Sequence, residues 1–139
     1  MPTLELIVNV EVGFLDQRGR VDESRAHTLQ ITNQAEFSLN FAKAGAKALG
    51  KPEAVMSTIV SFNNSLTFGG TLDPAFSLTV TSLDNLSSEA NEKYSATFSD
   101  FIDSNLGIPK DRGYIIFRDP GREYMGYKGT TFASLWANK

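Results

Sequence analysis

Pro2 is the first residue whose type and position could do chemistry. The chain opens with Met1 and Pro2 and continues directly into the alternating stretch "TLELIVNV". If Met1 is removed, the Pro2 nitrogen becomes a secondary amine, and a free α-amine titrates near pH 7.7–8.0. An apolar pocket penalises the charged form, so that the neutral amine can act as a general base. The alternative is that Pro2 simply opens an edge strand, which its position alone favours.

Other reactive side chains are scarce. The chain has no cysteine, which excludes disulfides, thiolate metal sites and thiol catalysis. Its single histidine, His27, disfavours a catalytic triad or a histidine-rich metal site. We therefore predict no metal and no cofactor. The net charge of −3 and the pI near 5.1 provide no basic field for nucleic acid, and no apolar run is long enough for membrane insertion.

The hydrophobic pattern predicts the elements that must position Pro2. With 139 residues and 15.2 kDa, we expect a single domain over residues 1–139. Helices are predicted from the cap at Asn33 to Gly50, and from the caps Ser87 and Ser88 to Gly107. Alternating or β-branched runs predict strands over residues 4–12, 55–62, 75–83 and 113–117.

Three segments lie outside this pattern. Residues 13–32 are polar and predict a long surface connection, in which "HTLQIT" (27–32) could add an edge strand. The stretch "EYMGYKG" (123–129) predicts a short hairpin, and residues 134–139 form a short C-terminal extension.

The chain also contains an internal repeat. The stretch "LGKPEAVMSTIV" begins at Leu49, and "LGIPKDRGYIIF" begins at Leu106. Each ends a helix and starts a strand, which predicts an α+β fold: a duplicated β-α-β unit, with two helices on one face of a four-stranded mixed sheet. A ferredoxin-like domain and other duplicated folds share this pattern. The second face of the sheet must also be covered, because the strands are apolar on both sides, and another copy of the chain is the expected cover.

Five motifs occur in order: Pro2 after Met1, "GKP" (50–52), "FGG" (68–70) followed by "DP" (73–74), "PKDRGYI" (109–115) and "GYKGTTFA" (126–133). Together they resemble the macrophage migration inhibitory factor and D-dopachrome tautomerase family, within the tautomerase superfamily. The resemblance implies a homotrimer with active sites between neighbouring subunits. It also implies a cofactor-independent tautomerase, an isomerase of small aromatic keto or enol acids such as phenylpyruvate or dopachrome. The connection 13–32 is longer than this family usually has.

The same resemblance implies roles for individual residues. Pro2 would be the catalytic base, and Lys51 would bind the substrate carboxylate and disfavour the protonated amine. The backbone amide of Leu83 would contact the substrate, and Tyr114 would reach the pocket of the neighbouring subunit. The remaining substrate-binding positions are Ile116, Met125 and Phe132.

Two positions depart from the family pattern. Ile116 stands where family members have asparagine or arginine, so that a polar donor to the substrate is missing, and Val55 replaces an aromatic residue at the pocket rim. We therefore expect a more apolar pocket and weak turnover.

The alternative function is a cytokine-like trimer with weak or no tautomerase activity, for which a cell-surface receptor would be the partner. A purely structural trimer is a third reading. Because "MPTLELIVNV" lacks the positive start of a signal peptide, the expected location is the cytoplasm, the outside of the cell by a route without a signal peptide, or both.

Overall fold

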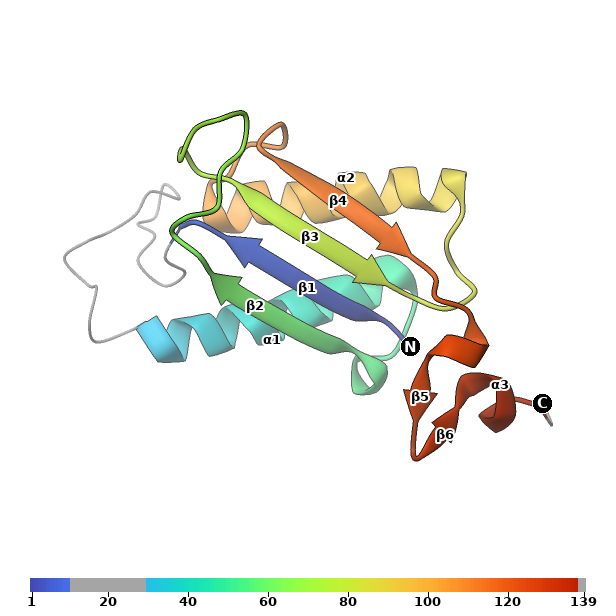
Figure 1. Ribbon diagram of the computed structural model, residues 1–139. Helices are drawn as coiled ribbons and strands as arrows, with labels where there is room; N and C mark the ends of the chain where they lie inside the picture. The colour runs from blue at the N-terminus through green and yellow to red at the C-terminus, as the bar shows by residue number, and fades with distance from the viewer. Residues whose placement is uncertain (11–29, 138–139) are drawn as a thin grey trace.

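A four-stranded mixed sheet forms the centre of the molecule. The computed structural model describes residues 1–10 and 30–137. The strands are β1 (Thr3–Val8), β2 (Ser57–Phe62), β3 (Phe76–Thr81) and β4 (Gly113–Arg118), in the spatial order β2-β1-β3-β4 (Figure 1). β1 runs parallel to β2, β3 runs parallel to β4, and the two pairs meet antiparallel between β1 and β3.

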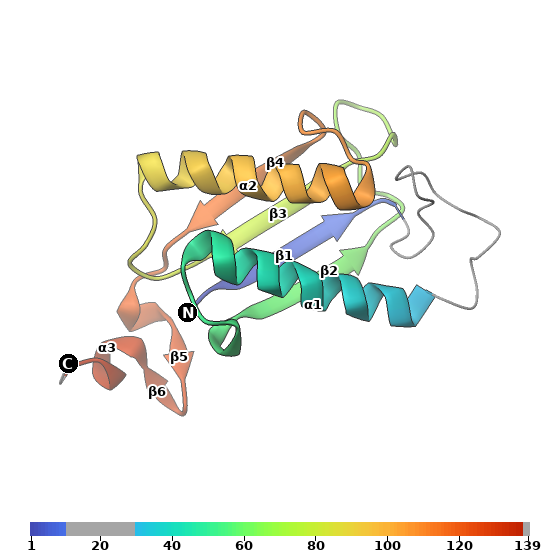
Figure 2. The same ribbon diagram turned by 180° about the vertical axis from the view of Figure 1, so that it is seen from behind.

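Two long helices cover one face of this sheet. They are α1 (Gln30–Leu49) and α2 (Ser88–Leu106), and both lie in front of the strands when the molecule is seen from behind (Figure 2). Each helix joins a pair of parallel strands, which confirms the predicted duplicated β-α-β unit. None of the helices in the described ranges has the length and apolar character needed to cross a membrane.

The core lies between the helices and the sheet because alternate strand residues point toward the helices. In β1, Leu4, Leu6 and Val8 are buried, whereas the residues between them face the other side of the sheet. Phe41 of α1 and Phe98 of α2 meet edge to face, with ring centroids 5.9 Å apart. Each fully buried side chain of this size stabilises the fold by about 1.5–3 kcal/mol relative to exposure.

The predicted helix stops are confirmed. Gly50 follows α1 with φ +67°, and the amide of Lys51 donates to the carbonyl of Ala46 at 2.9 Å. Gly107 ends α2 in the same left-handed conformation. A residue without a Cβ adopts this conformation at little cost, and it turns the chain back toward the sheet. At the start of α2, the side chain of Ser87 accepts a hydrogen bond from the amide of Ala90 at 3.1 Å, as a cap does.

Helix α1 begins earlier than predicted. Its first residue is Gln30, so Asn33 lies inside the helix rather than capping it, and residues 30–32 are helical rather than part of an edge strand. The rest of the predicted connection 13–32, with His27, lies outside the described residues.

The first strand ends at Val8, before the predicted residues 9 and 10, and the predicted residues 11–12 lie outside the described ones. The side chain of Asn9 binds a loop instead. Its side-chain amide donates to the carbonyls of Leu66, Leu72 and Asp73 at 2.9–3.2 Å, and its side-chain oxygen accepts from the amide of Ala75 at 2.7 Å. These bonds fix the loop between β2 and β3.

Arg112 holds the same loop from the other side. Its guanidinium donates to the carbonyls of Phe68, Asp73 and Pro74 and to the hydroxyl of Thr71, at 2.7–3.2 Å. The guanidinium carbon also lies 5.3 Å from the centroid of the Phe68 ring. The loop thus gains a fixed shape without regular secondary structure.

The short elements gather at one end of the sheet. A 3-10 turn, η2 (Glu53–Val55), precedes β2, and a second one, η3 (Arg122–Tyr124), follows β4. The predicted hairpin is confirmed as β5 (Gly126–Tyr127) and β6 (Thr130–Thr131). It continues into α3 (Phe132–Leu135), which includes the start of the predicted extension 134–139. We call residues 119–137 the C-terminal segment; it projects beyond the sheet near the start of β1 (Figure 1).

The face of the sheet away from the helices is mixed rather than apolar throughout. Its exposed apolar side chains are Ile7, Ile59, Ile116 and Tyr114, with exposed fractions of 38%, 51%, 51% and 74%. On β3 the same face carries only the hydroxyl side chains Ser77, Thr79 and Thr81. The prediction of strands that are apolar on both sides therefore holds for parts of β1 and β2 but is wrong for β3.

Candidate active site

A cavity of about 270 Å³ opens where β1 and β2 begin. Residues 1–3, residues 54–57 and the C-terminal segment line it, the last through residues 125–127 and Phe132. The start of the central strand, the turn η2 and the terminal hairpin therefore meet at one place, although they lie far apart in the sequence.

Pro2 lies at the wall of this cavity on a rigid element. The residue is buried, and its carbonyl accepts a hydrogen bond from the amide of Ser57 at 3.0 Å. The next residue, Thr3, pairs with Ser57 in the parallel ladder of β1 and β2. The strand pairing thus fixes the position of Pro2 against the cavity.

Met56 contributes to the cavity and to the core at once. It follows the turn η2, in which the amide of Met56 donates to the carbonyl of Glu53 at 3.0 Å. Its side chain packs against the core, and its methyl carbon would lie only 3.1 Å from a Cβ built on Gly45 of α1. The absence of a side chain at Gly45 therefore leaves the room that Met56 occupies beneath the helix.

The opposite wall is an aromatic stack in the C-terminal segment. The rings of Tyr127 and Phe132 lie nearly parallel, 5.7 Å apart with 5° between their planes, and Phe132 packs on Trp136 at 4.7 Å. The turn of the hairpin consists of Lys128 and Gly129, both with positive φ, which matches the twist of two paired strands. The amide of Phe132 donates to the carbonyl of Met125 at 3.0 Å and closes this unit.

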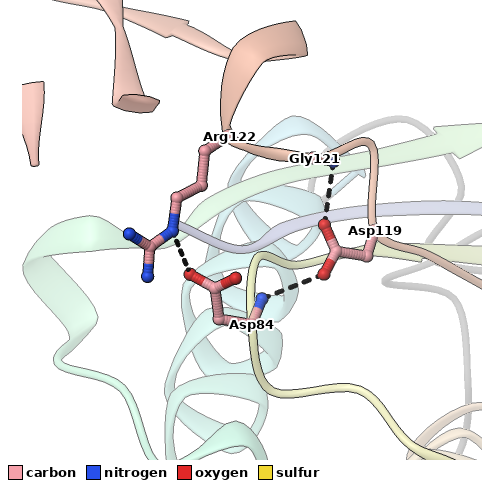
Figure 3. A network of polar contacts seen from close by, with 4 residues as sticks. All are labelled: Asp84, Asp119, Gly121 and Arg122. Atoms are coloured by element: carbon pink, nitrogen blue, oxygen red, sulfur yellow. Dashed lines mark hydrogen bonds and ion pairs between the residues drawn. The ribbon is translucent and has the colours of Figure 1, made fainter. Parts of the chain in front are cut away.

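A polar network attaches the C-terminal segment to the loop after β3 (Figure 3). Asp119 accepts from the amides of Asp84 and Gly121 at 3.0 and 2.9 Å. Arg122 donates from Nε to the carboxylate of Asp84 at 2.8 Å, and its guanidinium carbon lies 5.0 Å from the ring centroid of Trp136. The aromatic wall of the cavity is therefore connected, through Arg122, to a loop of the main sheet.

Charges of both signs act on the terminal amine at this end of the sheet. Burial lowers the pKa of the Met1 amine below its usual value, and the positive charge of Lys51 lowers it further. The carboxylates of Asp84 and Asp119 act in the opposite direction and raise it. Because the lowering effects prevail, an amine here favours its neutral form more than an exposed one does.

The structure brings some of the sequence-predicted site residues together. Pro2, Met125 and Phe132 line the cavity. Lys51 does not line it, but its charge reaches the terminal amine. Leu83 lies in the core, 1% exposed, and its side chain is not part of the cavity.

Tyr114 and Ile116 lie elsewhere. Both belong to β4 and are exposed on the open face of the sheet, and neither lines the cavity of its own chain. The ring of Tyr114 packs on Phe68, with centroids 5.0 Å apart.

Sequence reasoning missed Met56 and Tyr127 as lining residues. A signal for Tyr127 was available, because it stands two residues after Met125 in the predicted hairpin, where alternate residues of a strand share a side. No comparable signal identified Met56, whose role depends on the space beside Gly45.

Comparisons with known proteins agree on one family. A sequence model described as "Macrophage migration inhibitory factor (MIF)" matches residues 29–133. The macrophage migration inhibitory factor homolog of Trichuris trichiura is 36% identical over 100 residues, which cover 69% of this chain and 88% of that protein. A MIF-like protein of Caenorhabditis elegans is 31% identical over 104 residues, or 75% of this chain and 85% of that protein.

The fold is similar as well. The structure of the macrophage migration inhibitory factor from Trichinella spiralis superposes with a TM-score of 0.75 at 25% identity. The superposition covers 94% of this chain and 99% of that one.

Proposed function

This chain belongs to the macrophage migration inhibitory factor family, and on that basis we propose that it is a cofactor-independent keto–enol tautomerase. The proposed substrates are small aromatic acids of the phenylpyruvate and dopachrome type. The observation that carries the proposal is the position of Pro2, buried at the start of the central strand and lining a cavity with largely apolar walls.

The proposed base is the Pro2 nitrogen after removal of Met1. In the conversion of a keto acid, the neutral amine takes a proton from the carbon beside the carbonyl, and the protonated amine then gives a proton to the carbonyl oxygen to form the enol. The reverse reaction returns the proton to carbon. Burial and the Lys51 charge lower the pKa of the Met1 amine, which is one residue away. Acting on the Pro2 nitrogen in the same direction, they would favour its neutral form.

The walls of the cavity suit the proposed substrates. Met56, Met125, Tyr127 and Phe132 offer apolar and aromatic surface to a phenyl ring. Lys51 supplies the positive charge for the substrate carboxylate. These groups bind and orient the acid, while Pro2 moves the proton.

We propose further that the active assembly is a homotrimer, in which a neighbour supplies Tyr114 and Ile116. Both residues are exposed on β4 and do not line the cavity of their own chain. Exposed apolar residues on a sheet face favour burial against a partner. In such a shared pocket, Ile116 would present an apolar side chain at a place where a hydrogen-bond donor would stabilise the transition state. We therefore expect slow turnover.

Enol–keto conversion of phenylpyruvate, followed by absorbance, tests the catalytic role. We expect Pro2→Gly to lose about tenfold or more of kcat, because glycine replaces the secondary amine with a primary one and lacks the ring that fixes the position of the nitrogen. Lys51→Ala should lose about tenfold or more of kcat/KM through the missing charge-assisted contact. Lys47→Ala is the matched control, because Lys47 is an exposed lysine in the last turn of α1 and does not line the cavity.

The state of the amino terminus provides a second test. Intact mass should show that active protein lacks Met1, and protein that retains Met1 should be inactive because the Pro2 nitrogen is then an amide. If the wild type is no faster than both Pro2→Gly and Lys51→Ala, the tautomerase proposal is wrong, and the receptor-binding trimer becomes the function to test.

A further inference from the structure

All the sulfur in this protein surrounds one cavity. The chain contains three methionines and no cysteine. Met1, Met56 and Met125 all line the cavity beside Pro2. They come from three separate segments of the sequence, so the fold rather than the chain order gathers them.

The three thioethers are accessible to small molecules. Each methionine is partly exposed, and the cavity that they line has a volume of about 270 Å³. In the form without Met1, two thioethers remain, one at the floor (Met56) and one in the C-terminal wall (Met125). A hydroperoxide that reaches the cavity therefore meets the only thioethers of the protein.

We propose that Met56 and Met125 form an oxidative modification site, at which a hydroperoxide converts both thioethers to sulfoxides and thereby blocks the cavity. In each reaction the sulfur gives two electrons and gains one oxygen atom as the O–O bond of the peroxide breaks. Hydrogen peroxide is thus reduced to water. Methionine sulfoxide reductases reverse the change.

Oxidation of Met56 and Met125 would change the wall of the cavity, because both side chains line it. A sulfoxide turns a flexible apolar side chain into a polar one, and its oxygen needs a hydrogen-bond partner or water. Met56 also has little space beneath α1, since its methyl carbon is close to Gly45. Oxidation would therefore place a polar group in an apolar wall and displace a tightly packed side chain.

The experiment uses the full chain without Met1, treated with hydrogen peroxide at neutral pH. Peptide mass spectrometry follows one added oxygen at Met56 and at Met125. Phenylpyruvate turnover is measured on the same samples, and so is the affinity for the fluorescent aromatic anion anilinonaphthalene sulfonate. We expect both methionines to gain oxygen and kcat/KM to fall about tenfold or more, with recovery after treatment with methionine sulfoxide reductases.

The double variant Met56→Leu with Met125→Leu isolates the sulfur atoms, because leucine preserves volume and cannot form a sulfoxide. Each sample is compared with its own untreated half, so that altered basal turnover does not matter. The treated-to-untreated ratio of the double variant should stay near one.

Two results would overturn the proposal. One is that the folded protein resists oxidation at both methionines while the chain unfolded in urea is oxidised. The other is that both sulfoxides form without any change in turnover or probe affinity. The effect on turnover rests on the proposed tautomerase function; if the untreated protein is inactive, mass and probe affinity still decide whether the site exists.

Discussion

At the residue scale, the central feature is an amine between opposing charges. Lys51 and burial lower the pKa of the terminal amine, whereas Asp84 and Asp119 raise it. The two carboxylates are not free surface charges, because both take part in the network that holds the C-terminal segment (Figure 3). The same side chains therefore influence both the proposed base and the wall of its cavity.

This arrangement predicts opposite pH shifts for two variants. A general base works in its neutral form, so kcat/KM should rise with pH through the pKa of the free amine. Lys51→Ala removes a charge that lowers this pKa, and the rising limb should move to higher pH. Asp84→Asn removes a charge that raises it, and the limb should move to lower pH.

The measurement is the pH profile of kcat/KM for phenylpyruvate in both variants and the wild type. Asp103→Asn serves as a control, because Asp103 is an exposed carboxylate on α2 that does not act on the amine. A profile that does not move in either variant would contradict the assignment of the amine as the base.

Part of the candidate site was predictable from the sequence. Pro2 was singled out by its position and Met125 and Phe132 by the family resemblance, and all three line one cavity. Met56 could not be predicted, because its place depends on a gap in another element, at Gly45 of α1. The roles of Tyr114 and Ile116 stay predictions, which depend on the proposed assembly with a second chain.

At the element scale, the duplicated unit was predictable because its signals are local. Gly50 and Gly107 follow the ends of the helices because glycine readily adopts a positive φ, and Ser87 caps the start of α2 with its side chain. All three positions act as predicted. The errors arise where distant contacts decide. β1 ends before Asn9, whose side chain binds carbonyls more than fifty residues away, and nothing in the local pattern indicates these contacts.

Close packing between β3 and β4 gives a prediction for Gly113. A Cβ at this position would lie 2.5 Å from the backbone oxygen and from two ring carbons of Phe76, which pairs with it across the sheet. Gly113→Ala should therefore destabilise the fold by about 2–3 kcal/mol, since neither the strand nor the buried ring can move away freely.

Urea unfolding measures this effect as a lower midpoint with an unchanged slope. Lys93→Ala, on the exposed side of α2, is the control and should change stability by less than about 0.5 kcal/mol. A Gly113→Ala protein as stable as this control would show that the two strands are less closely packed than described.

At the scale of the whole molecule, the open face of the sheet sets the expected assembly. Light scattering after size exclusion should give a mass three times that of the 15.2 kDa chain. Ile59→Glu places a charge in the exposed apolar part of this face and should shift the protein toward monomers. Leu39→Glu is the matched control, because Leu39 is an exposed residue of α1 on the opposite side of the molecule.

A wild-type protein that runs as a stable monomer would contradict the trimer and the shared pocket together. Loss of the trimer in both glutamate variants would instead show that the interface is not specific to the sheet.

The two copies of the internal repeat differ at equivalent positions. Lys51 and Ile108 hold the same place in the two copies of the repeat, and so do Val55 and Arg112. In the first copy, Val55 lines the cavity and the charge of Lys51 acts on the terminal amine. In the second copy, Ile108 is buried in the core and Arg112 binds the loop between β2 and β3. The second copy of the repeat thus supports the fold, whereas the first copy borders the cavity.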